Sequence, residues 1–447
     1  MKTKVSYLIY KIRTGFWFVP TVITIGAIVL SQLILMADRH FPAALFEKLG
    51  GLFLIGPEAA RLLMSTIAGS MITVTSLVFS LTLIALTMTS SQFGPRLLTS
   101  FMQDRVTQIV LGTFLATFVF SLITLGSIHK ANEEEIVPHL SIGTAMVMAI
   151  GSFGILIYFI HHIASSIQAD SIIAKVAREL DQAIESQFEA IGDDGDAQRD
   201  SITLPERENL AADSATVRSN QDGYIQAIDH ERLMVLGVEH NVTVWLECRA
   251  GHFIVPGEPI ALVHPASRAN ADVVGAVADT LVVGQTHTMV QDLEFAVNAL
   301  VEIALRALSP GINDTYTAIA CIDNISSALA EVLKRRPPPP ALLDDAGSVR
   351  VIVNPLTFGG LLASAFNEIR QTAPGNVSVV IRLLEALIRI APFATEAEQQ
   401  NAIFRQAQMI DRSFRTEIDE PNDRDDIEQR FKRLADILDK NQSVRSA

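Results

Sequence analysis

Hydroxyl side chains recur on one helical face in the charge-free stretch between Arg61 and Arg96. At 100° per residue they fall within an arc of about 120°. With two large apolar residues on the same arc, the set is Thr66, Ser70, Thr73, Ser76, Leu77, Ser80, Ile84, Thr87 and Ser91. Hydroxyl oxygens on a membrane helix can replace part of an ion's hydration shell, and the two apolar residues would narrow such a path. The same residue types also let two helices pack closely. The pattern therefore predicts either a pore wall or a packing face.

Three further stripes of small or polar residues accompany this face. Thr75, Thr82 and Thr89 repeat at heptad spacing on the opposite side of the same helix, so one stripe can pack while the other faces water. The next apolar stretch carries Thr113, Thr117, Ser121 and Thr124 on one side. The last one carries Gly143, Thr144, Gly151, Ser152 and Gly154, which we interpret as close-packing positions.

A second polar group surrounds the turn Ser309-Pro310-Gly311, where one helical pattern stops and another begins. Its members are Arg306, Ser309, Asn313, Asp314, Thr317 and Asp323. The amides at a helix start can hold an anion, so a ligand or nucleotide sensor is one interpretation. The other is a capped turn in which Arg306 and Asp314 tie two helices together or join subunits. Because no nucleophile system, phosphate-binding loop or zinc motif is present, we expect no enzyme, metal site or cofactor.

Four apolar stretches have the roughly 20 residues that a bilayer crossing needs. They cover about residues 16–37, 66–89, 106–128 and 139–163, so residues 1–163 are expected to form a four-helix transmembrane domain. No charged residue lies within the core of a span, which weighs against a proton-coupled transporter. Lys and Arg favour the side of the amino terminus. We therefore expect both termini in the cytoplasm, with Arg96 and Arg105 at the inner mouth.

The charge is unevenly distributed along the chain. The net charge is −14 over 447 residues, and most of the acidic residues follow the last span. An acidic body argues against a nucleic-acid partner, because phosphate binding needs a basic surface. The two cysteines, Cys248 and Cys321, are too few and too far apart for a disulfide framework.

The rest of the chain is expected to form an α+β region outside the membrane. Residues 164–214 predict a long helix that continues from the fourth span, followed by an acidic linker. Residues 215–283 alternate short strand-like runs with Gly and Pro turns, and their order resembles the barrel-sandwich hybrid fold of biotinyl and lipoyl carriers. Such carriers need a lysine, and none lies between Lys175 and Lys334, so a purely structural small β barrel is expected. Residues 284–447 predict an all-α domain with one short strand near residues 349–353.

Several motifs resemble one bacterial family of membrane proteins, known only as a domain of unknown function (DUF2254). The strongest is Arg306-Ala307-Leu308-Ser309-Pro310-Gly311-Ile312-Asn313-Asp314; Ser91-Gln92-Phe93-Gly94-Pro95-Arg96, Gly223-Tyr224 and Gln291-Asp292 also match. Two residues depart from the family pattern. Thr315 replaces a usual proline, which relaxes the helix start, and His287 replaces a common arginine, which would weaken an anion contact there. The resemblance implies an architecture but no activity.

Two functional hypotheses follow. The first is a homo-oligomeric ion channel in the bacterial inner membrane, lined by the polar face of the second span, because four helices per subunit are few to enclose a path. Its partners would be the lipid bilayer, other copies of the chain and permeant inorganic ions. The second is a membrane-anchored scaffold or ligand sensor whose spans only pack.

Overall fold

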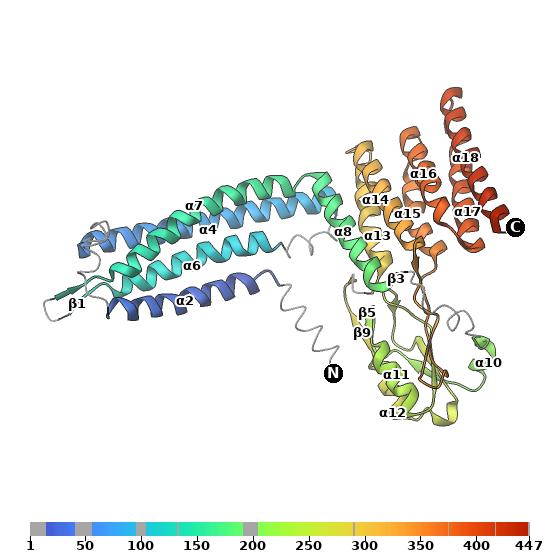
Figure 1. The fold of residues 1–447 in the computed structure, drawn as a ribbon, viewed down its shortest axis with the longest axis horizontal. Helices are drawn as coiled ribbons and strands as arrows, with labels where there is room; N and C mark the ends of the chain where they lie inside the picture. The colour runs from blue at the N-terminus through green and yellow to red at the C-terminus, as the bar shows by residue number, and fades with distance from the viewer. Residues whose placement is uncertain are drawn as a thin grey trace. The chain divides into compact units, whose positions relative to one another are not determined.

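The computed structural model describes residues 15–40, 56–94, 104–131, 134–190, 204–288, 291–373, 375–415 and 417–445. The chain divides into two compact units, Met1–Ser171 and Ile172–Ala447. Each unit is built around its own set of helices (Figure 1).

The first unit contains four helices that are long and apolar enough to cross a membrane, as predicted. They are α2 (Phe18–Asp38), α4 (Pro57–Phe93), α6 (Arg105–Ser127) and α7 (His139–Ser166), with strands β1 (His129–Ala131) and β2 (Glu134–Ile136) between the last two. Helix α4 has 37 residues. At 1.5 Å per residue it is about 55 Å long, which exceeds the hydrocarbon core of roughly 30 Å.

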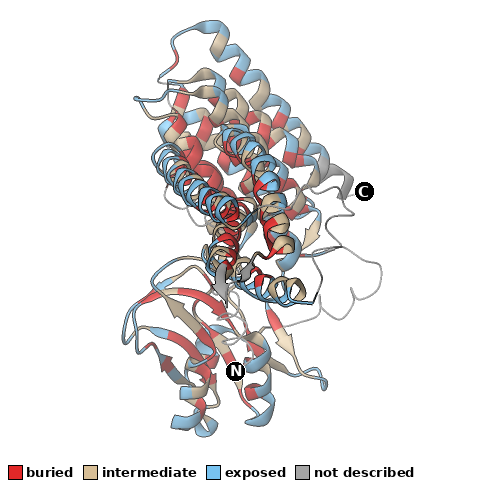
Figure 2. Ribbon diagram, turned by 90° about the vertical axis from the view of Figure 1, so that its left-hand side faces the viewer, coloured by how far each residue is buried: buried red, intermediate tan, exposed pale blue. Residues whose placement is uncertain are grey.

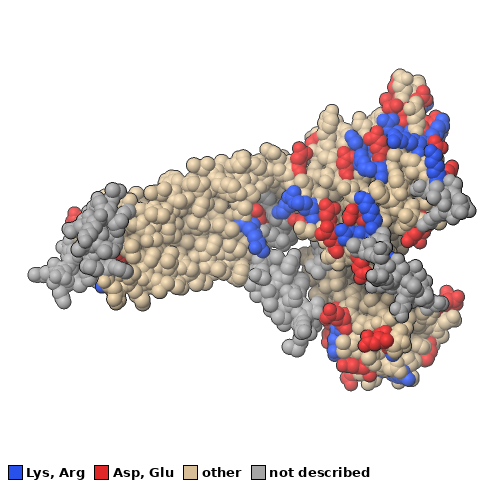
Figure 3. All heavy atoms as spheres, viewed as in Figure 1, with Lys and Arg blue, Asp and Glu red and all other residues tan. Residues whose placement is uncertain are grey.

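Helix α6 is central, because it packs against α2, α4 and α7. Gly112 of α6 lets α2 approach closely, since a Cβ atom there would lie 2.8 Å from Cδ1 of Ile23 and 3.0 Å from Cα of Pro20. The large aromatic side chains Phe114 and Phe120 of α6 are buried between the helices. The middle of this unit shows no charged side chain on the face drawn in Figure 3.

Charged residues at the helix ends join neighbouring helices. Asp38, the last residue of α2, accepts hydrogen bonds from the backbone N–H groups of Leu140 (2.8 Å) and Ser141 (2.9 Å) in the first turn of α7. The hydroxyl of Ser141 donates to the same carboxylate at 2.6 Å. Arg61 donates to the carbonyl of Ile128 at the end of α6 (3.0 Å). Each charge thus satisfies backbone groups that a helix end leaves open.

The prediction of one long helix beyond the fourth span is wrong. Helix α7 ends at Ser166, and α8 begins at Ala169 and continues to Gln187. The hydroxyls of Ser165 and Ser166 donate to the carbonyls of His161 and His162 one turn earlier, at 2.9 and 2.7 Å. Paired serines of this kind compete with the backbone ladder and are common at helix breaks. Most of the predicted acidic linker lies outside the described residues.

The β region of the second unit forms two open sheets and no closed barrel. One has five strands in the order β11-β12-β6-β8-β4, and the other has three in the order β7-β5-β9. The strands are β4 (Ala215–Arg218), β5 (Gly223–Ile228), β6 (Thr243–Leu246), β7 (Phe253–Ile254), β8 (Pro259–His264), β9 (Leu281–Gly284), β11 (Ala341–Leu343) and β12 (Val349–Ile352). Helices α10 (Arg207–Ala211), α11 (His230–Glu239) and α12 (Ala271–Ala278), and the short helix η2 (Ala266–Arg268), accompany the strands.

Two observations explain why the barrel prediction failed. Helices α11 and α12 occupy stretches that were expected to contain strands and turns, and their apolar sides join the core beneath the sheets. In addition, β12 pairs in parallel with β6, with Val351 opposite Val244 and Ile352 opposite Trp245. The sheet is therefore completed by residues about 100 positions further along the chain, and the C-terminal region is not all-α.

Six helices follow in two rows (Figure 1). They are α13 (Leu293–Ala307), α14 (Thr315–Leu333), α15 (Phe358–Thr372), α16 (Val377–Ile390), α17 (Ala397–Phe414) and α18 (Pro421–Arg445), with η3 (Ala391–Phe393) between α16 and α17. Helix α15 packs against α13 and α17, and α16 packs against α14 and α18. Such an array of helical hairpins is stabilised mainly by contacts between neighbours. The β3 (Glu189–Ala190) and β10 (Arg335–Arg336) strands pair and tie the end of α8 to the end of α14.

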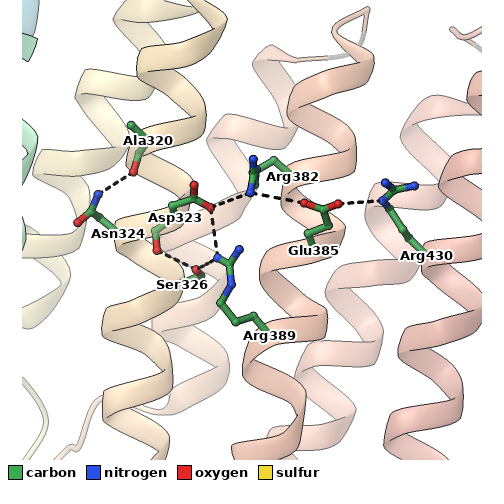
Figure 4. A network of polar contacts seen from close by, with 8 residues as sticks. All are labelled: Ala320, Asp323, Asn324, Ser326, Arg382, Glu385, Arg389 and Arg430. Carbon is green, nitrogen blue, oxygen red and sulfur yellow. Dashed lines mark hydrogen bonds and ion pairs between the residues drawn. The ribbon is translucent and has the colours of Figure 1, made fainter. Parts of the chain in front are cut away.

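A chain of ion pairs crosses the row formed by α14, α16 and α18 (Figure 4). Asp323 of α14 pairs with Arg382 (3.4 Å) and Arg389 (3.2 Å) of α16. Glu385 of α16 pairs with Arg430 of α18 at 3.1 Å. The side chains are partly exposed, so each pair contributes roughly 1 kcal/mol or less. Because positive and negative groups alternate, from Arg389 through Asp323, Arg382 and Glu385 to Arg430, the network holds the neighbouring helices side by side.

Replacing Asp38 with alanine should destabilise the first unit, because three donors at the start of α7 lose their acceptor. Hydrogen bonds to a charged group contribute about 1.5–3 kcal/mol each, and they are not additive, so a loss of about 2–3 kcal/mol is expected. Thermal unfolding of the full-length protein in detergent measures it. Glu58→Ala removes an exposed carboxylate of α4 and should change stability by less than about 0.5 kcal/mol. Equal effects of the two substitutions would contradict the capping role.

Candidate functional site

Among the described residues, no other helix covers the polar face of α4. All nine residues of the set are exposed: Thr66, Ser70, Thr73, Ser76, Leu77, Ser80, Ile84, Thr87 and Ser91. Leu77 and Ile84 expose 52% and 55% of their surface. Figure 2 shows exposed residues along the outward sides of the membrane-spanning helices. The structure thus separates the two stripes of α4, since Thr82 and Thr89 of the other stripe are buried inside the bundle.

The exposed surface of α4 has an apolar part and a polar part. Ile72, Phe79 and Leu83 are exposed apolar residues on one side of it, where lipid contact costs nothing. The polar arc lies beside them on the same helix. Several of its hydroxyls donate to the carbonyl group one turn earlier: Thr66 to Leu62 (2.7 Å), Thr73 to Gly69 (2.9 Å) and Ser76 to Ile72 (3.0 Å). These protons are therefore satisfied within the helix, and the oxygen lone pairs remain available.

Small residues also lie on the outer surface of the first unit. Gly69 of α4 and Gly151 and Gly154 of α7 are exposed, and a Cβ atom at each would meet no other atom within 4 Å. The interpretation of Gly151 and Gly154 as packing positions is therefore wrong within a single chain. Ser152, by contrast, is buried, and its hydroxyl lies 3.4 Å from that of Thr117 on α6.

Arg96 and Arg105 were predicted at the inner mouth of the path. Arg105 is exposed in the first turn of α6, whereas Arg96 lies outside the described residues. Beside Arg105, Asp104 caps α6 by accepting from the backbone N–H (3.1 Å) and hydroxyl (2.6 Å) of Thr107. Asp104 also lies 2.9 Å from Nε2 of His162 on α7. A hydrogen-bond contact thus joins the start of α6 to α7.

The loop between α13 and α14 forms a self-contained capped turn. Asp314 is the capping residue directly before α14, and its carboxylate accepts from the backbone N–H (3.1 Å) and hydroxyl (2.6 Å) of Thr317. Asn313 has a φ of +49°, which allows the N–H of Asp314 to donate to the carbonyl of Ala307 at 2.7 Å. The start of the helix is therefore occupied by the protein's own carboxylate, which favours the capped turn over an anion site.

The other predicted loop residues serve the same turn or its helices. Arg306 contacts Glu302 on its own helix at 3.2 Å, and the hydroxyl of Ser309 donates to the carbonyl of Arg306 at 2.6 Å. Thr315, in the place of a proline, accepts a hydrogen bond from Asn376 at the start of α16 (2.7 Å). A proline at this position has no hydroxyl and could not accept this bond. The tip of the loop presents Ile312 and Tyr316, which are 50% and 85% exposed.

Asp292, part of the family motif Gln291-Asp292, lies at a junction at the other end of α13, where it contacts His287 and Gly251. The sequence reveals the motif but not these contacts. Asp292 caps α13 by accepting from the N–H of Phe295 (2.9 Å), and its second oxygen lies 3.2 Å from Nδ1 of His287. Burial raises the pKa of the Asp292 carboxyl, although both contacts act in the opposite direction. Gly251, with a φ of +90°, packs directly on this carboxylate, where a Cβ atom would clash at 2.3 Å.

His287 is held between aromatic rings at this junction. Its ring lies 3.8 Å from the ring of Tyr224 and stacks on Phe295 at 5.1 Å and 8°. The group that faces position 287 is thus a protein carboxylate. An arginine at this position would pair with Asp292, which differs from the contact with a bound anion that the sequence suggested.

Among the described residues, no group of three or more His, Cys, Asp or Glu side chains is placed to hold a metal ion. Both cysteines are buried, and burial raises the pKa of the Cys248 thiol to about 12. Cys248 is therefore a protonated, unreactive thiol at neutral pH.

Replacing Asp314 with alanine should lower the free energy of unfolding by about 1 kcal/mol at neutral pH, the usual value of a helix cap. The bonds from Thr317 hold the pKa of the Asp314 carboxyl below its ordinary value of 3.8. Its contribution is therefore complete above about pH 4 and is lost as the pH falls further. Chemical unfolding at pH 7 and pH 3.5 should show a smaller effect at the lower pH. Asp314→Ser should retain most of the stability, and the exposed Asp345→Ala serves as the control.

Replacing His287 with arginine should stabilise the junction, because a planar guanidinium can stack between the rings and pair with Asp292 at any working pH. A gain of up to about 1 kcal/mol is expected at neutral pH. Urea unfolding of the wild type, His287→Arg and His287→Ala measures it. A loss in His287→Arg as large as that of His287→Ala would contradict the carboxylate contact.

The sequence can now be compared with known proteins. It matches the family described as "Predicted membrane protein (DUF2254)" over residues 13–389. It is similar to uncharacterised proteins of Mycobacterium tuberculosis and Mycobacterium bovis, each 28% identical over 376 residues, which cover 82% of this chain and 70% of the relative. No solved structure matches the chain. The family's description as a membrane protein agrees with the four apolar helices. The chain belongs to the DUF2254 family of membrane proteins.

Proposed function

We propose that this protein is a homo-oligomeric ion channel in which the polar face of α4 from each subunit lines the path. The second unit would assemble the subunits and gate the path. The observation that carries the proposal is the exposure of all nine predicted residues on α4, while the opposite face of that helix is packed inside the bundle.

The chemistry of the exposed face supports contact with water and ions. A hydroxyl that donates its proton to its own helix, as Thr66 and Ser76 do, presents oxygen lone pairs to the outside. Lone pairs suit a partly dehydrated cation better than an anion. We therefore favour inorganic cations as the permeant species. Leu77 and Ile84 would form the hydrophobic constriction on the same face.

The arrangement of the subunits follows from the same surface. A single chain leaves the polar face at its periphery, so a path closed on all sides requires several copies around an axis. The open positions at Gly69, Gly151 and Gly154 would let helices of neighbouring copies approach closely. The alternative is a membrane-anchored scaffold or sensor, in which the polar face only packs against a second copy.

Replacing Ser80 with leucine tests the channel. The full-length protein is reconstituted in liposomes, and the fluxes of K⁺, Na⁺ and Cl⁻ are measured. The wild type should conduct cations, and Ser80→Leu should reduce the flux at least tenfold, because a bulky apolar side chain enters the narrow path. Subunit assembly, measured by light scattering in detergent, should not change.

Phe79→Leu is the matched control, because it places the same side chain one residue away on the apolar flank. It should retain nearly full flux. An assembled wild-type protein without flux, or a Ser80→Leu variant that conducts normally, would argue against the channel. Loss of assembly in Ser80→Leu would favour the packing face of a scaffold.

A further inference from the structure

A cavity of about 440 Å³ lies within the second unit, and none of the predicted site residues lines it. Its walls come from the end of α8, the sheets, the first turn of α13, and the segment after β12. Most of the surface is apolar, and it is contributed by Phe188, Ile228, Leu246, Leu293, Leu342 and Leu356. Cavities of this size, largely apolar with a few polar groups, are typical of sites for small molecules.

The positive charge of Arg249 in the lining is already neutralised by the protein. Arg249 pairs with Glu294 at 2.6 Å, and the other oxygen of Glu294 accepts from the hydroxyl of Ser364 at 3.0 Å. Burial lowers the pKa of His230, so its ring is neutral at pH 7. The chain has no lysine between Lys175 and Lys334. The described lining therefore offers no unpaired positive charge to a phosphate or carboxylate, and an uncharged ligand fits it better.

One polar group of the lining is still unsatisfied. The side-chain Nε2 of Gln187, the last residue of α8, is buried and has no acceptor among the described residues. A buried donor without an acceptor costs about 1–3 kcal/mol. An oxygen atom of a ligand would supply the missing acceptor. Nearby, the thiol of Cys248 donates to the carbonyl of Ile260 (3.4 Å) and remains protonated, so a ligand would be held without a covalent bond.

We propose that this cavity binds an uncharged, mainly apolar small molecule with a hydrogen-bond acceptor, such as a carbonyl oxygen, directed at Gln187. The apolar walls supply most of the affinity through the burial of the ligand surface. Gln187 fixes the orientation of the ligand. The proposal concerns binding and does not depend on ion conduction.

Benzophenone is a suitable probe, because it is uncharged, mainly apolar and carries one ketone. On irradiation it also forms a covalent bond to neighbouring C–H groups. The full-length protein in detergent is irradiated with it, and mass spectrometry locates the labelled peptides. The peptides that contain residues 246–250 and 338–342 should be labelled.

Two variants test the site independently. Ala250→Phe fills the cavity and should reduce labelling of these peptides at least tenfold. Gln187→Leu removes the donor at similar size and should reduce it about fivefold, even if Ala250→Phe does not fold. The matched control Gln221→Leu makes the same change at an exposed turn and should label like the wild type. Labelling that avoids these peptides, or that persists unchanged in folded Ala250→Phe or in Gln187→Leu, would overturn the proposal.

Discussion

Many serine and threonine hydroxyls of the membrane-spanning helices donate to a carbonyl group of their own helix, one turn earlier, as in Thr66, Thr82 and Ser152. In an apolar medium a polar group must find its partner within the protein, and this local bond supplies one to exposed and buried side chains alike. The same rule places the charges, because Asp38, Arg61 and Asp104 lie at helix ends, where open backbone groups need a charged partner. The first unit can therefore carry a polar face along α4 without any charge in its middle.

This rule also explains why the polar face alone does not settle its use. A hydroxyl whose proton is bound to its own helix is compatible with a neighbouring helix and with water. The packing inside the chain narrows the alternatives, because α6 covers the stripe with Thr82 and Thr89 and leaves the other stripe exposed. The exposed stripe is the surface on which the proposed channel and the alternative scaffold differ.

In the second unit, helix α13 connects two structural features of the chain. Its last turn leads into the family's signature loop, where Asp314 and Asn313 form a tight, capped connection to α14. Its first turn contains Asp292, which holds His287 and the backbone of Gly251 together. The signature loop is therefore best explained by its structural role, and the cavity at the opposite end of α13 is the better place for a small ligand. The wall of this cavity includes the end of α8, the helix that follows α7 in the chain.

The sequence by itself determined the features that depend on local physics. The four spans follow from apolar length, and the starts of α14, α15 and α16 follow from the caps Asp314, Thr357 and Asn376, whose side chains bond amides three residues away. The tertiary structure decided the features that depend on distant residues. Pairing of β12 with β6, the open sheets, the exposed stripe of α4 and the cavity beside Gln187 all join segments far apart in the chain. No local pattern records such contacts, because a strand or a helix face looks the same in sequence whichever segment comes to cover it.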